Sequence, residues 1–370
     1  MKILYISHLH PPKNEPLKNI GGMQNVSMQM IDTLSKKDHV DIETIILHTS
    51  WKWIGIKTFF FLVTLLWRLP AAIKKHQPDV VLFSSMVTAS VVPFLLGKRK
   101  TSFVTINHGQ DVTLPFFLYQ WYLPKVFKKL QGVISVSLAT RQACIDRGMP
   151  PEIGVALPNG FDASRVKILP EKSDARKLLE EEFNIDLKGR KLLLSVGRQV
   201  KRKGHEWFIR EVFDKIESDV IFLLIGDGPE HEAIKSAKME SSLKQKVIIA
   251  GRQSDEILDA AYAGADLFVM PNVPVKGDME GFGIVLLEAN RAGVPAVAAD
   301  LEGIKDVITQ GVNGYRVPHG DANQFATKID EVLQGELEEL SKKAVEFVEN
   351  TFSWDSVADR YVSFLRSVNE

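Results

Sequence analysis

The chain has 370 residues, of which 45% are hydrophobic and 25% are charged, a composition typical of a folded globular protein. Its length exceeds what one compact core of ordinary size needs, which predicts two domains. The single cysteine, Cys144, excludes an internal disulfide bond and indicates a reducing compartment.

The formal net charge is zero, but the two halves of the chain carry opposite charge. Residues 1–160 contain 18 Lys and Arg against 9 Asp and Glu, whereas residues 161–370 contain 28 against 37. The basic first half predicts a polyanionic partner, either anionic lipid headgroups, a phosphorylated acceptor or nucleic acid. Nucleic acid is the weakest of the three, because the chain has no recognised nucleic-acid-binding motif. Alternatively, two charged domain surfaces attract each other across a cleft.

Short apolar runs alternate with longer helical stretches along the whole chain. The predicted strands form two series: Lys2–Ser7, Ile42–Leu47, Asp79–Ser84, Ser102–Ile106, Gly132–Ser137 and Gly154–Leu157, then Lys191–Val196, Val220–Ile225, Lys246–Ala250, Leu267–Met270, Val294–Ala298 and Gly314–Val317. This alternation predicts parallel, doubly wound sheets, and two series predict two Rossmann-like α/β domains. The polar stretch from Asn159 to Gly189 is expected to link them, and a helix from Trp354 to Val368 ends the chain.

The start of the chain contains two features that bear on its location and its ligand. The apolar run Ile3–Ile6 is too short for the hydrophobic region of a secretory signal, so we expect a cytoplasmic protein. Gly21-Gly22 then opens a predicted helix over Met23–Leu34. Backbone N–H groups at that helix start suit a phosphate, whereas a hinge or turn is the alternative role of the glycine pair.

Two segments of the basic half combine large apolar side chains with basic neighbours. Trp53–Trp67 is mostly apolar and precedes Arg68, Lys74 and Lys75, whereas Phe116–Lys129 mixes aromatic residues with lysines. With fifteen residues, the first segment is shorter than the roughly twenty that a bilayer-spanning helix needs. We therefore expect peripheral attachment to an anionic membrane, on its inner face. The alternative for Trp53–Trp67 is a core helix packed on the first sheet.

Polar side chains follow the fourth predicted strand. His108 comes just after that strand and before Gly109, which places it to hydrogen-bond a sugar hydroxyl or to line a reaction centre. The alternative is a loop histidine bonded to a nearby carbonyl. Asp111 either contacts an acceptor or caps the segment that follows.

A cluster of cations follows the first strand of the second series. Arg198 and the run Lys201-Arg202-Lys203 are expected at the carboxyl end of Lys191–Val196, where open α/β sheets bind ligands. Fixed cations there would stabilise the negative charge of a departing diphosphate. A solvent-exposed basic turn is the alternative.

Two carboxylates, Glu280 and Glu288, stand eight residues apart in the second half. Glu280 lies in a glycine-flanked loop and Glu288 within an apolar run of helical length. Gly281 and Gly283 leave the backbone bare, and the N–H groups at the start of the following helix suit a phosphate. A carboxylate beside a phosphate would bind hydroxyl groups, because like charges repel. A phosphate next to a polyol predicts a nucleotide sugar.

This segment resembles the E-x7-E motif of retaining glycosyltransferases of the GT-B fold, a large family that includes sucrose synthases and bacterial mannosyltransferases and glucosyltransferases. Further motifs occur in the order that this family shows: Gly21-Gly22, His108-Gly109, Asn159-Gly-Phe-Asp162, Ser195-Val-Gly-Arg198, Lys203-Gly204, Ile225-Gly-Asp-Gly-Pro229, Gly251, Pro271 and Gly293-Val-Pro295. The resemblance therefore covers nearly the whole chain.

The resemblance implies a retaining glycosyltransferase that moves a hexose from a nucleoside-diphosphate sugar to an acceptor, and the predicted membrane contact suits a lipid or lipid-linked acceptor. It implies the GT-B fold, with two Rossmann-like domains facing across a cleft. Residues 1–165 would form the acceptor-side domain and residues 166–353 the donor domain. The last helix, within residues 354–370, would return to the first domain.

The family also implies which residues act on the donor and on the transferred sugar. Arg198 and Lys203 would hold the diphosphate, and Lys201 and Arg202 are expected to be solvated neighbours. His108 and Glu280 would contact the transferred sugar. The other donor-binding residues would be Gly22, Asp227, Arg252, Gly281, Phe282, Gly283, Ile284, Val285 and Glu288, of which Glu288 would bind the ribose. Gly21 and Asp111 would lie on the acceptor side.

No cofactor is expected beyond the nucleotide sugar, which is a co-substrate. The chain contains no Asp-x-Asp sequence and no His, Cys and Asp cluster with metal-ligand spacing, so we expect no metal site.

Dinucleotide redox chemistry is the main alternative for doubly wound domains. Its G-x-G-x-x-G fingerprint must follow a strand directly. The first predicted strand is followed by His8–Pro12, which contains no glycine, and in the segment that starts at Gly226 the third glycine is replaced by His231. A nucleotide-sugar epimerase or phosphorylase of the same fold, and a non-catalytic nucleotide-sugar-binding protein, remain as alternatives.

Overall fold

The computed structural model describes residues 1–12, 22–50, 53–95, 100–160 and 169–369. The chain divides into two compact units, of which the first contains Met1–Gly160 together with Phe352–Glu370 and the second contains Phe161–Thr351. The helix at the end of the chain therefore belongs to the first unit. The domain boundary expected after residue 165 falls within 161–168, outside the described residues.

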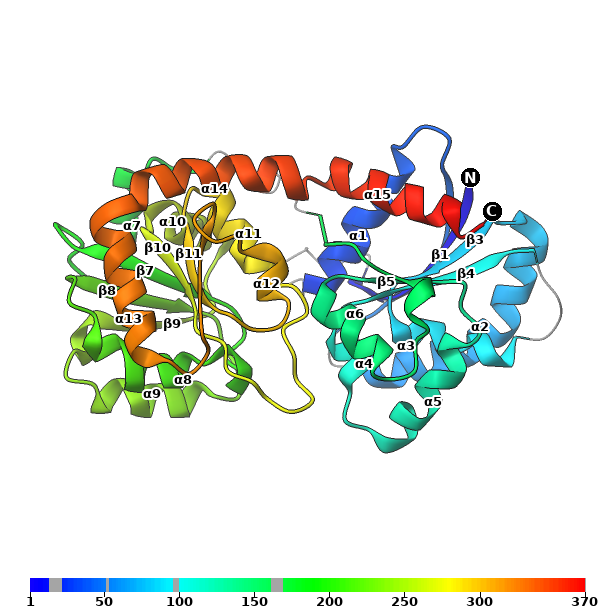
Figure 1. The fold of residues 1–370 in the computed structure, drawn as a ribbon, viewed down its shortest axis with the longest axis horizontal. Helices are drawn as coiled ribbons and strands as arrows, with labels where there is room; N and C mark the ends of the chain where they lie inside the picture. The colour runs from blue at the N-terminus through cyan, green and yellow to red at the C-terminus, as the bar shows by residue number, and fades with distance from the viewer. Residues whose placement is uncertain (13–21, 51–52, 96–99, 161–168, 370) are drawn as a thin grey trace. The chain divides into compact units, whose positions relative to one another are not determined.

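The first unit is built on a six-stranded parallel sheet (Figure 1). Its strands are β1 (Lys2–His10), β2 (Asp41–His48), β3 (Val80–Phe83), β4 (Ser102–Asn107), β5 (Gly132–Ser135) and β6 (Gly154–Ala156). They lie in the order β2-β1-β3-β4-β5-β6, and all pairs are parallel. The chain reverses its direction of progress across the sheet between β1 and β3, which is where such sheets place a ligand.

Helices cover both faces of this sheet. They are α1 (Gly22–Ser35), α2 (Ile54–His76), α3 (Met86–Ala89), α4 (Gln110–Thr113), α5 (Phe117–Phe127), α6 (Leu138–Ile145) and α15 (Trp354–Ser367), with short 3-10 turns at Val92–Phe94 and Pro151–Ile153. Buried residues of α2 and α5 share one hydrophobic cluster with Leu4 and Ile6 of β1. Helix α15 is tied to the end of α1, because Lys37 Nζ lies 2.7 Å from carboxylate oxygens of both Asp355 and Asp359.

The second unit contains another six-stranded parallel sheet. Its strands are β7 (Lys191–Val196), β8 (Val220–Ile225), β9 (Val247–Gly251), β10 (Leu267–Met270), β11 (Ala296–Ala299) and β12 (Gly314–Val317). The order is β12-β11-β10-β7-β8-β9, so the reversal lies between β7 and β10. This is the strand order of a Rossmann fold, in which the ligand binds beyond the carboxyl ends of the strands at the reversal.

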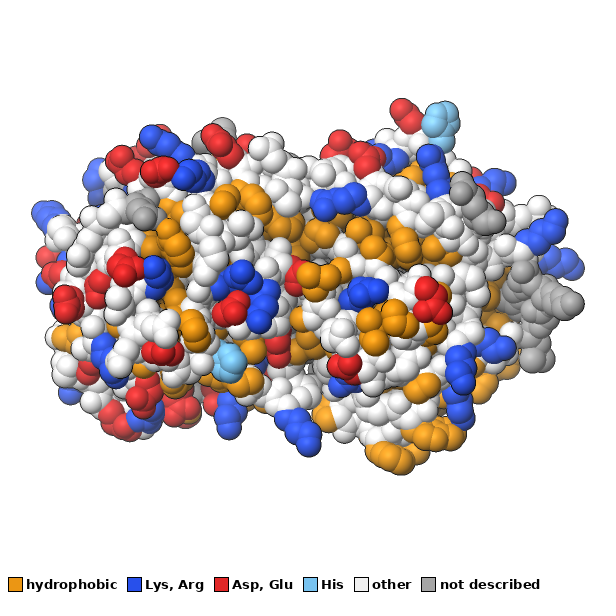
Figure 2. All heavy atoms as spheres, viewed as in Figure 1, with side chains coloured by type: hydrophobic (Ala, Val, Ile, Leu, Met, Phe, Trp, Pro, Cys, Tyr) orange, Lys and Arg blue, Asp and Glu red, His pale blue; other side chains and the backbone are white. Residues whose placement is uncertain are grey.

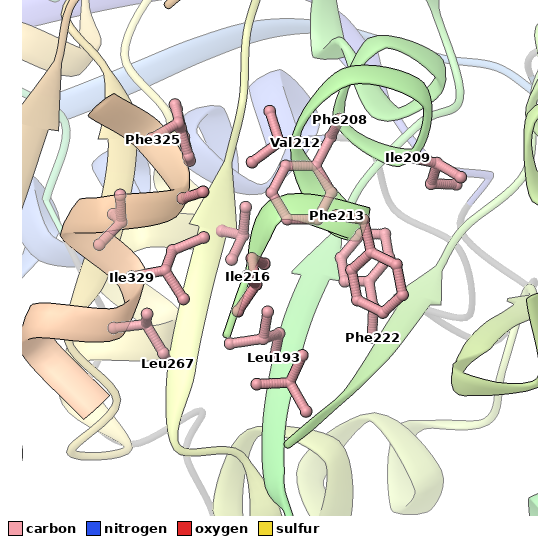
Figure 3. Packing of buried hydrophobic residues seen from close by; sticks show 14 of the residues in the cluster. Leu193, Phe208, Ile209, Val212, Phe213, Ile216, Phe222, Leu267, Phe325 and Ile329 are labelled. Carbon is pink, nitrogen blue, oxygen red and sulfur yellow. The ribbon is translucent and has the colours of Figure 1, made fainter. Parts of the chain in front are cut away.

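The core of the second unit is closely packed and rich in phenylalanine. Its helices and helical turns are α7 (Lys172–Phe183), η5 (Lys201–Lys203), α8 (His205–Trp207), a π-helical turn (Phe208–Val212), η7 (Phe213–Lys215), α9 (His231–Glu240), η8 (Lys244–Lys246), α10 (Asp255–Gly264), α11 (Ile284–Arg291), α12 (Ile304–Val307), α13 (Ala322–Glu331), a second π-helical turn (Val332–Glu336) and α14 (Leu337–Phe352). Figure 3 shows Phe208 and Phe213 beside Phe222 of β8, with ring centroids 4.9 and 6.0 Å from that of Phe222. From α13, Phe325 and Ile329 close the other side of this cluster.

These observations confirm two Rossmann-like α/β domains, and all twelve predicted strands are present. Helix α2 differs from its prediction. It extends over 23 residues from Ile54 to His76, whereas the apolar segment Trp53–Trp67 has fifteen, fewer than a bilayer-spanning helix needs. By length and composition α2 could span a membrane, the one such helix among the described residues. The helix continues beyond Trp67 because its charged residues lie on the exposed side and leave the buried face uninterrupted. It also contains Pro70 without ending there.

Candidate functional site

The residues predicted to bind the donor gather at the reversal point of the second sheet. Lys203 ends the connection that follows β7, and Glu280 lies in the connection that follows β10. Their side chains meet, with Lys203 Nζ 2.6 Å from Glu280 Oε2. Both residues are buried, with exposed fractions of 7% and 8%. The connections that follow two neighbouring strands thus place a cation and a carboxylate at one point, as parallel sheets of this order allow.

Close packing of the backbone brings these two connections together. Gly204 follows Lys203 directly and has a left-handed backbone with φ of 66°. A Cβ atom at this position would lie 2.0 Å from the carbonyl oxygen of Pro271, at the end of β10. Only glycine meets both conditions, which gives the Lys203-Gly204 pair a physical reason. The amide of Val273 also donates to the carbonyl of Arg202, at 2.9 Å.

Three side chains donate to the same oxygen of Glu280. Besides Lys203, the Arg202 guanidinium donates to Oε2, and Asn272 Nδ2 lies 3.3 Å from it. Arg202 also donates to Asp278 Oδ1 at 2.9 Å. The expectation that Arg202 is a solvated neighbour is therefore wrong, because its side chain is only 14% exposed and bridges two carboxylates. Lys201 is exposed, as expected.

The cations determine the charge state of the site. Burial on its own raises the pKa of Glu280, but the charges of Lys203 and Arg202 outweigh it and lower that pKa to about 2. For Lys203, burial lowers the pKa, and the charge of Glu280 opposes that change. Glu280 is thus a carboxylate at neutral pH. No hydrogen bond from the described part of the chain reaches its other oxygen, Oε1, which leaves that oxygen to accept from a ligand hydroxyl.

The predicted donor-binding segment after Glu280 leads directly into a helix. Gly281, Phe282 and Gly283 are buried, and Gly283 has φ of 84° immediately before α11 begins at Ile284. Ile284 and Val285 form the first turn, whose N–H groups have no partner within the helix. Glu288 lies one turn further along α11, where its Oε2 accepts from the hydroxyl of Tyr262 at 2.8 Å.

Three further predicted donor residues are exposed on loops of the same unit. Arg198 lies in the connection after β7, Asp227 in the one after β8 and Arg252 directly after β9. All three follow carboxyl ends of strands, on the same edge of the sheet as Glu280. The structure gives none of them a side-chain contact with Glu280 or Lys203, so their part in donor binding stays a prediction.

In the first unit, the predicted residues lie near the reversal between β1 and β3. His108 follows β4, and its Nε2 is 3.0 Å from the carbonyl oxygen of Ser84 at the end of β3. Because a carbonyl only accepts, this contact places the proton on Nε2 and leaves Nδ1 as an acceptor. Burial lowers the pKa of His108, although the charge of Asp111 opposes this. The carbonyl contact is the alternative role considered from sequence, and contact with a sugar stays a prediction.

Asp111 and the glycine pair complete the sequence-predicted set. Asp111 is buried, and its two oxygens accept the backbone N–H groups of His108 at 2.8 Å and Met86 at 3.0 Å. It therefore braces the loop that carries His108, and its contact with an acceptor stays a prediction. Gly22 is the first residue of α1, as expected, whereas Gly21 lies outside the described residues.

Some residues near these sites gave weak signals in the sequence or none. Asn272 follows the motif residue Pro271 and could have been selected for that reason. Tyr262, which positions Glu288, lies in the last turn of α10 and resembles any core tyrosine. In the first unit, His8 is buried at the end of β1, 3.5 Å from Ser85 Oγ. Burial and the neighbouring His108 lower the pKa of His8 to about 4. It is thus a second neutral histidine at the reversal point.

Comparison with known families assigns each half of the chain. The model of glycosyl transferases group 1 matches residues 179–354, and the model of glycosyltransferase family 4 matches residues 20–165. The first match contains β7 to β12 and the site around Glu280.

Individual relatives agree with this assignment. The amylovoran biosynthesis glycosyltransferase AmsK of Erwinia amylovora is 27% identical over 238 residues, which are 63% of this chain and 55% of that protein. A GDP-mannose-dependent alpha-(1-6)-phosphatidylinositol monomannoside mannosyltransferase of Mycolicibacterium smegmatis is 27% identical over 275 residues, or 72% of this chain and 70% of that protein.

Among solved structures, Anabaena HepE in complex with UDP has a TM-score of 0.74 and 18% identity, and the alignment covers 99% of this chain and 100% of that one. The alignment with AmsK, in contrast, spans only about half of that Erwinia protein. The two family models, the relatives and the shared fold agree with one another. The chain belongs to the GT-B glycosyltransferases.

Proposed function

We propose that the protein transfers a hexose from a nucleoside-diphosphate sugar to an acceptor, with retention of the anomeric configuration and without a resident cofactor. The observation that carries the proposal is the junction of Lys203, Glu280 and the start of α11 at the reversal point of the second sheet. It combines a fixed cation, an ionised carboxylate and free backbone N–H groups. This combination suits a diphosphate bound beside a polyol.

Three parts of the donor would be bound separately: the diphosphate, the hexose and the ribose. The N–H groups at Gly283 to Val285 and the ammonium of Lys203 would bind the diphosphate, because Glu280 takes one of the three hydrogens that a lysine ammonium can donate. Oε1 of Glu280 would accept from a hydroxyl of the hexose. Glu288, fixed by Tyr262, would accept from the ribose.

The proposed reaction develops negative charge on the departing diphosphate. The bond between the anomeric carbon and the diphosphate oxygen breaks, and the acceptor oxygen forms a bond to the same carbon from the same face. The acceptor proton passes to the departing phosphate. Arg198 and Lys203 would stabilise the negative charge on that phosphate, a contribution that is often worth a hundredfold or more in rate.

The first unit would serve the acceptor and the transferred sugar. His108, with Nδ1 as an acceptor, would bind a sugar hydroxyl, and Asp111 would hold its loop in place. Relatives suggest substrates of the right class. HepE was solved in complex with UDP-glucose, and the mycobacterial relative is described as acting on a phosphatidylinositol monomannoside. A nucleotide-sugar donor and a lipid or lipid-linked acceptor are therefore our proposal for this chain.

A lipid acceptor requires access to a membrane, and the exposed side of α2 is suited to it. Phe61, Leu65 and Leu69 are buried and recur every four residues on the face that packs into the unit. On the opposite side, the exposed residues Ile56, Phe60, Val63 and Trp67 recur every three or four residues, with exposed fractions up to 68%. A helix that packs one face on a protein core and exposes an apolar stripe on the other is suited to lie in a membrane surface.

Helix α5 adds a second exposed apolar group to the same unit. Phe116, Phe117, Leu118 and Trp121 are each at least 60% exposed, and Figure 2 shows hydrophobic side chains at the surface over α5. Lys125 Nζ lies 3.4 Å from the ring centroid of Trp121, and Lys128 and Lys129 are exposed nearby. Aromatic rings among lysines suit the boundary between acyl chains and anionic headgroups. We propose an anionic membrane as the partner of this surface.

Release of a nucleoside diphosphate by the purified protein tests the function directly. Candidate UDP- and GDP-sugars would first be ranked by the rise in melting temperature that they cause, because a ligand that binds the folded state stabilises it. The best donor would then be assayed with and without lipid acceptors, and the anomeric configuration of the product determined by NMR. Acceptor-dependent release with an α-linked product from an α-linked donor is expected. Binding without release, or epimerisation of the sugar, would contradict transfer.

A further inference from the structure

Glu302 has a backbone conformation that glutamate rarely adopts. Its φ is 49°, in the left-handed region, within the connection between β11 and α12. Among the described residues, the other non-glycine residues with positive φ are His39, Gln77 and Asn184. Gln77 and Asn184 follow the ends of helices, where left-handed residues are common. Glu302 precedes a helix, so its conformation has no such explanation.

The conformation places two consecutive residues against the backbone of Glu280. The carboxylate of Glu302 accepts the N–H of Glu280 at 2.5 Å, and the N–H of Gly303 donates to the carbonyl of Glu280 at 3.1 Å. Both polar backbone groups of Glu280 are therefore held by one short connection. A Cβ at position 303 would lie 2.2 Å from the carbonyl oxygen of Gly281, so the contact is as close as two backbones allow.

This arrangement is unfavourable for Glu302 in two further respects. Burial raises the pKa of Glu302, and so does the charge of Glu280. The residue therefore combines a strained backbone, partial burial and a like-charged neighbour. A glycine would remove the backbone strain and the repulsion, but it would also remove the bond to Glu280. Strain of this kind persists only where the surrounding structure enforces it, and it often occurs at functional sites.

We propose that Glu302 is a positioning residue, which fixes the backbone of Glu280 so that Oε1 of Glu280 and the start of α11 keep one geometry toward the donor sugar. The inference rests on the proposed function, in which Glu280 binds that sugar. Side-chain cations hold Glu280 through Oε2, whereas Glu302 and Gly303 hold it through the main chain. Together they leave the carboxylate little freedom to turn away from a ligand.

Two substitutions at this position, with one control, test the proposal. Glu302→Gly removes the carboxylate and relieves the backbone, so it is expected to fold with an unchanged or higher melting temperature. Glu302→Gln keeps a carbonyl oxygen that can accept the same N–H. The control is Asn184→Gly, which relieves a left-handed residue with the same φ of 49° in the same unit, on an exposed site after α7.

Hydrogen exchange of the Glu280 amide is the first measurement, and it requires no substrate. Glu302→Gly should accelerate this exchange by about tenfold, since a hydrogen bond to a charged group is lost. Glu302→Gln should restore most of the protection, and Asn184→Gly should leave it unchanged. The second measurement is steady-state kinetics. Glu302→Gly should raise the KM for the donor and lower kcat/KM by about tenfold, while Glu302→Gln stays within about threefold of wild type.

The outcomes separate this inference from the proposed function. Unchanged exchange at Glu280 in Glu302→Gly, or faster exchange with wild-type kinetics while Glu280→Gln is inactive, would overturn the positioning role. If Glu280→Gln keeps wild-type turnover, the role proposed for Glu280 fails instead. The contact between Glu302 and the Glu280 backbone would still be established by the exchange data.

Discussion

Lys203 and Glu280 form a buried ion pair, with Nζ 2.6 Å from Oε2, although they stand 77 positions apart in the sequence. The pair joins the connections after β7 and β10, the two strands between which the chain reverses direction across the sheet. Because the pair is buried, substitutions in it also affect the stability of the protein. Substituting Glu280 removes the carboxylate that pairs with the buried Lys203 ammonium, and substituting Lys203 removes one of the two cations that pair with Glu280. Breaking a buried ion pair typically costs about 3–5 kcal/mol of stability. Loss of activity in a Lys203 variant would therefore not by itself assign a catalytic role.

Arg198 offers a cleaner test of the cation predicted to hold the departing diphosphate. Its side chain is exposed, so Arg198→Ala should change the free energy of unfolding by no more than about 0.5 kcal/mol. Its kcat/KM should fall by about a hundredfold or more, because one charge donor to the transition state is lost. Lys201→Ala, an exposed cation three residues away, is the matched control and should retain wild-type kinetics. Wild-type turnover by Arg198→Ala would contradict the role.

The ion pair also predicts how stability depends on pH. The pKa of Glu280 is lowered from an ordinary value of 4.5 to about 2, so the unfolded chain takes up a proton at a higher pH than the folded protein. The stabilisation from this group is present above pH 4.5 and is lost as the pH falls toward 2. In urea unfolding, the stability difference between wild type and Glu280→Gln should shrink over that range, by a few kcal/mol. Unfolding free energies that stay parallel between pH 6 and pH 3 would contradict it.

Metal dependence can be tested independently of any residue. Because cationic side chains are proposed to stabilise the diphosphate, transfer should survive saturating EDTA with an unchanged rate. The measurement is nucleoside diphosphate release with and without chelator, followed by addition of Mg²⁺ or Mn²⁺. Activity lost on chelation and restored by either ion would contradict the metal-independent reaction.

Most of the fold could be predicted because buried parallel strands leave a strong local pattern. The bounds of β7, β8, β10 and β12 agree with the sequence to the residue, since each strand is followed directly by a glycine or a proline. Strand β1 is longer than predicted and ends at His10. His8 and His10 are polar, yet they are buried because the surrounding structure covers them. Local pattern does not contain that information.

Only the site residues that belong to a recognisable motif could be predicted from the sequence. Glu280, Glu288 and Lys203 stand out in the sequence because each belongs to a motif. The pairing of Arg202 with Glu280 depends on two loops meeting across 78 positions, and a run of three basic residues does not indicate which of them turns inward. The role of Glu302 was hidden for a different reason. A left-handed glutamate has no sequence signature, because the conformation is imposed by the contact that it makes.

Membrane attachment is the prediction that most affects the choice of acceptor. The protein should co-sediment with liposomes, and binding should rise with the fraction of anionic lipid and fall with salt, because it combines apolar insertion with basic residues. Phe60→Ser in α2 and Trp121→Ser in α5 each remove an exposed aromatic ring that is 61% and 60% accessible, respectively. Each should reduce binding severalfold and leave the melting temperature unchanged, since neither ring belongs to the buried core.

A matched control distinguishes a specific surface from general hydrophobicity. Met239 is 64% exposed in the second unit, on α9, and Met239→Ser should bind liposomes as wild type does. Because α2 keeps Phe61, Leu65 and Leu69 in the core of its unit, binding through its outer face should leave the fold intact, and the protein should be released by high salt without detergent. Equal recovery of wild-type protein in the supernatant at every lipid composition would defeat the proposal. A requirement for detergent would instead indicate that α2 leaves the core and inserts into the bilayer.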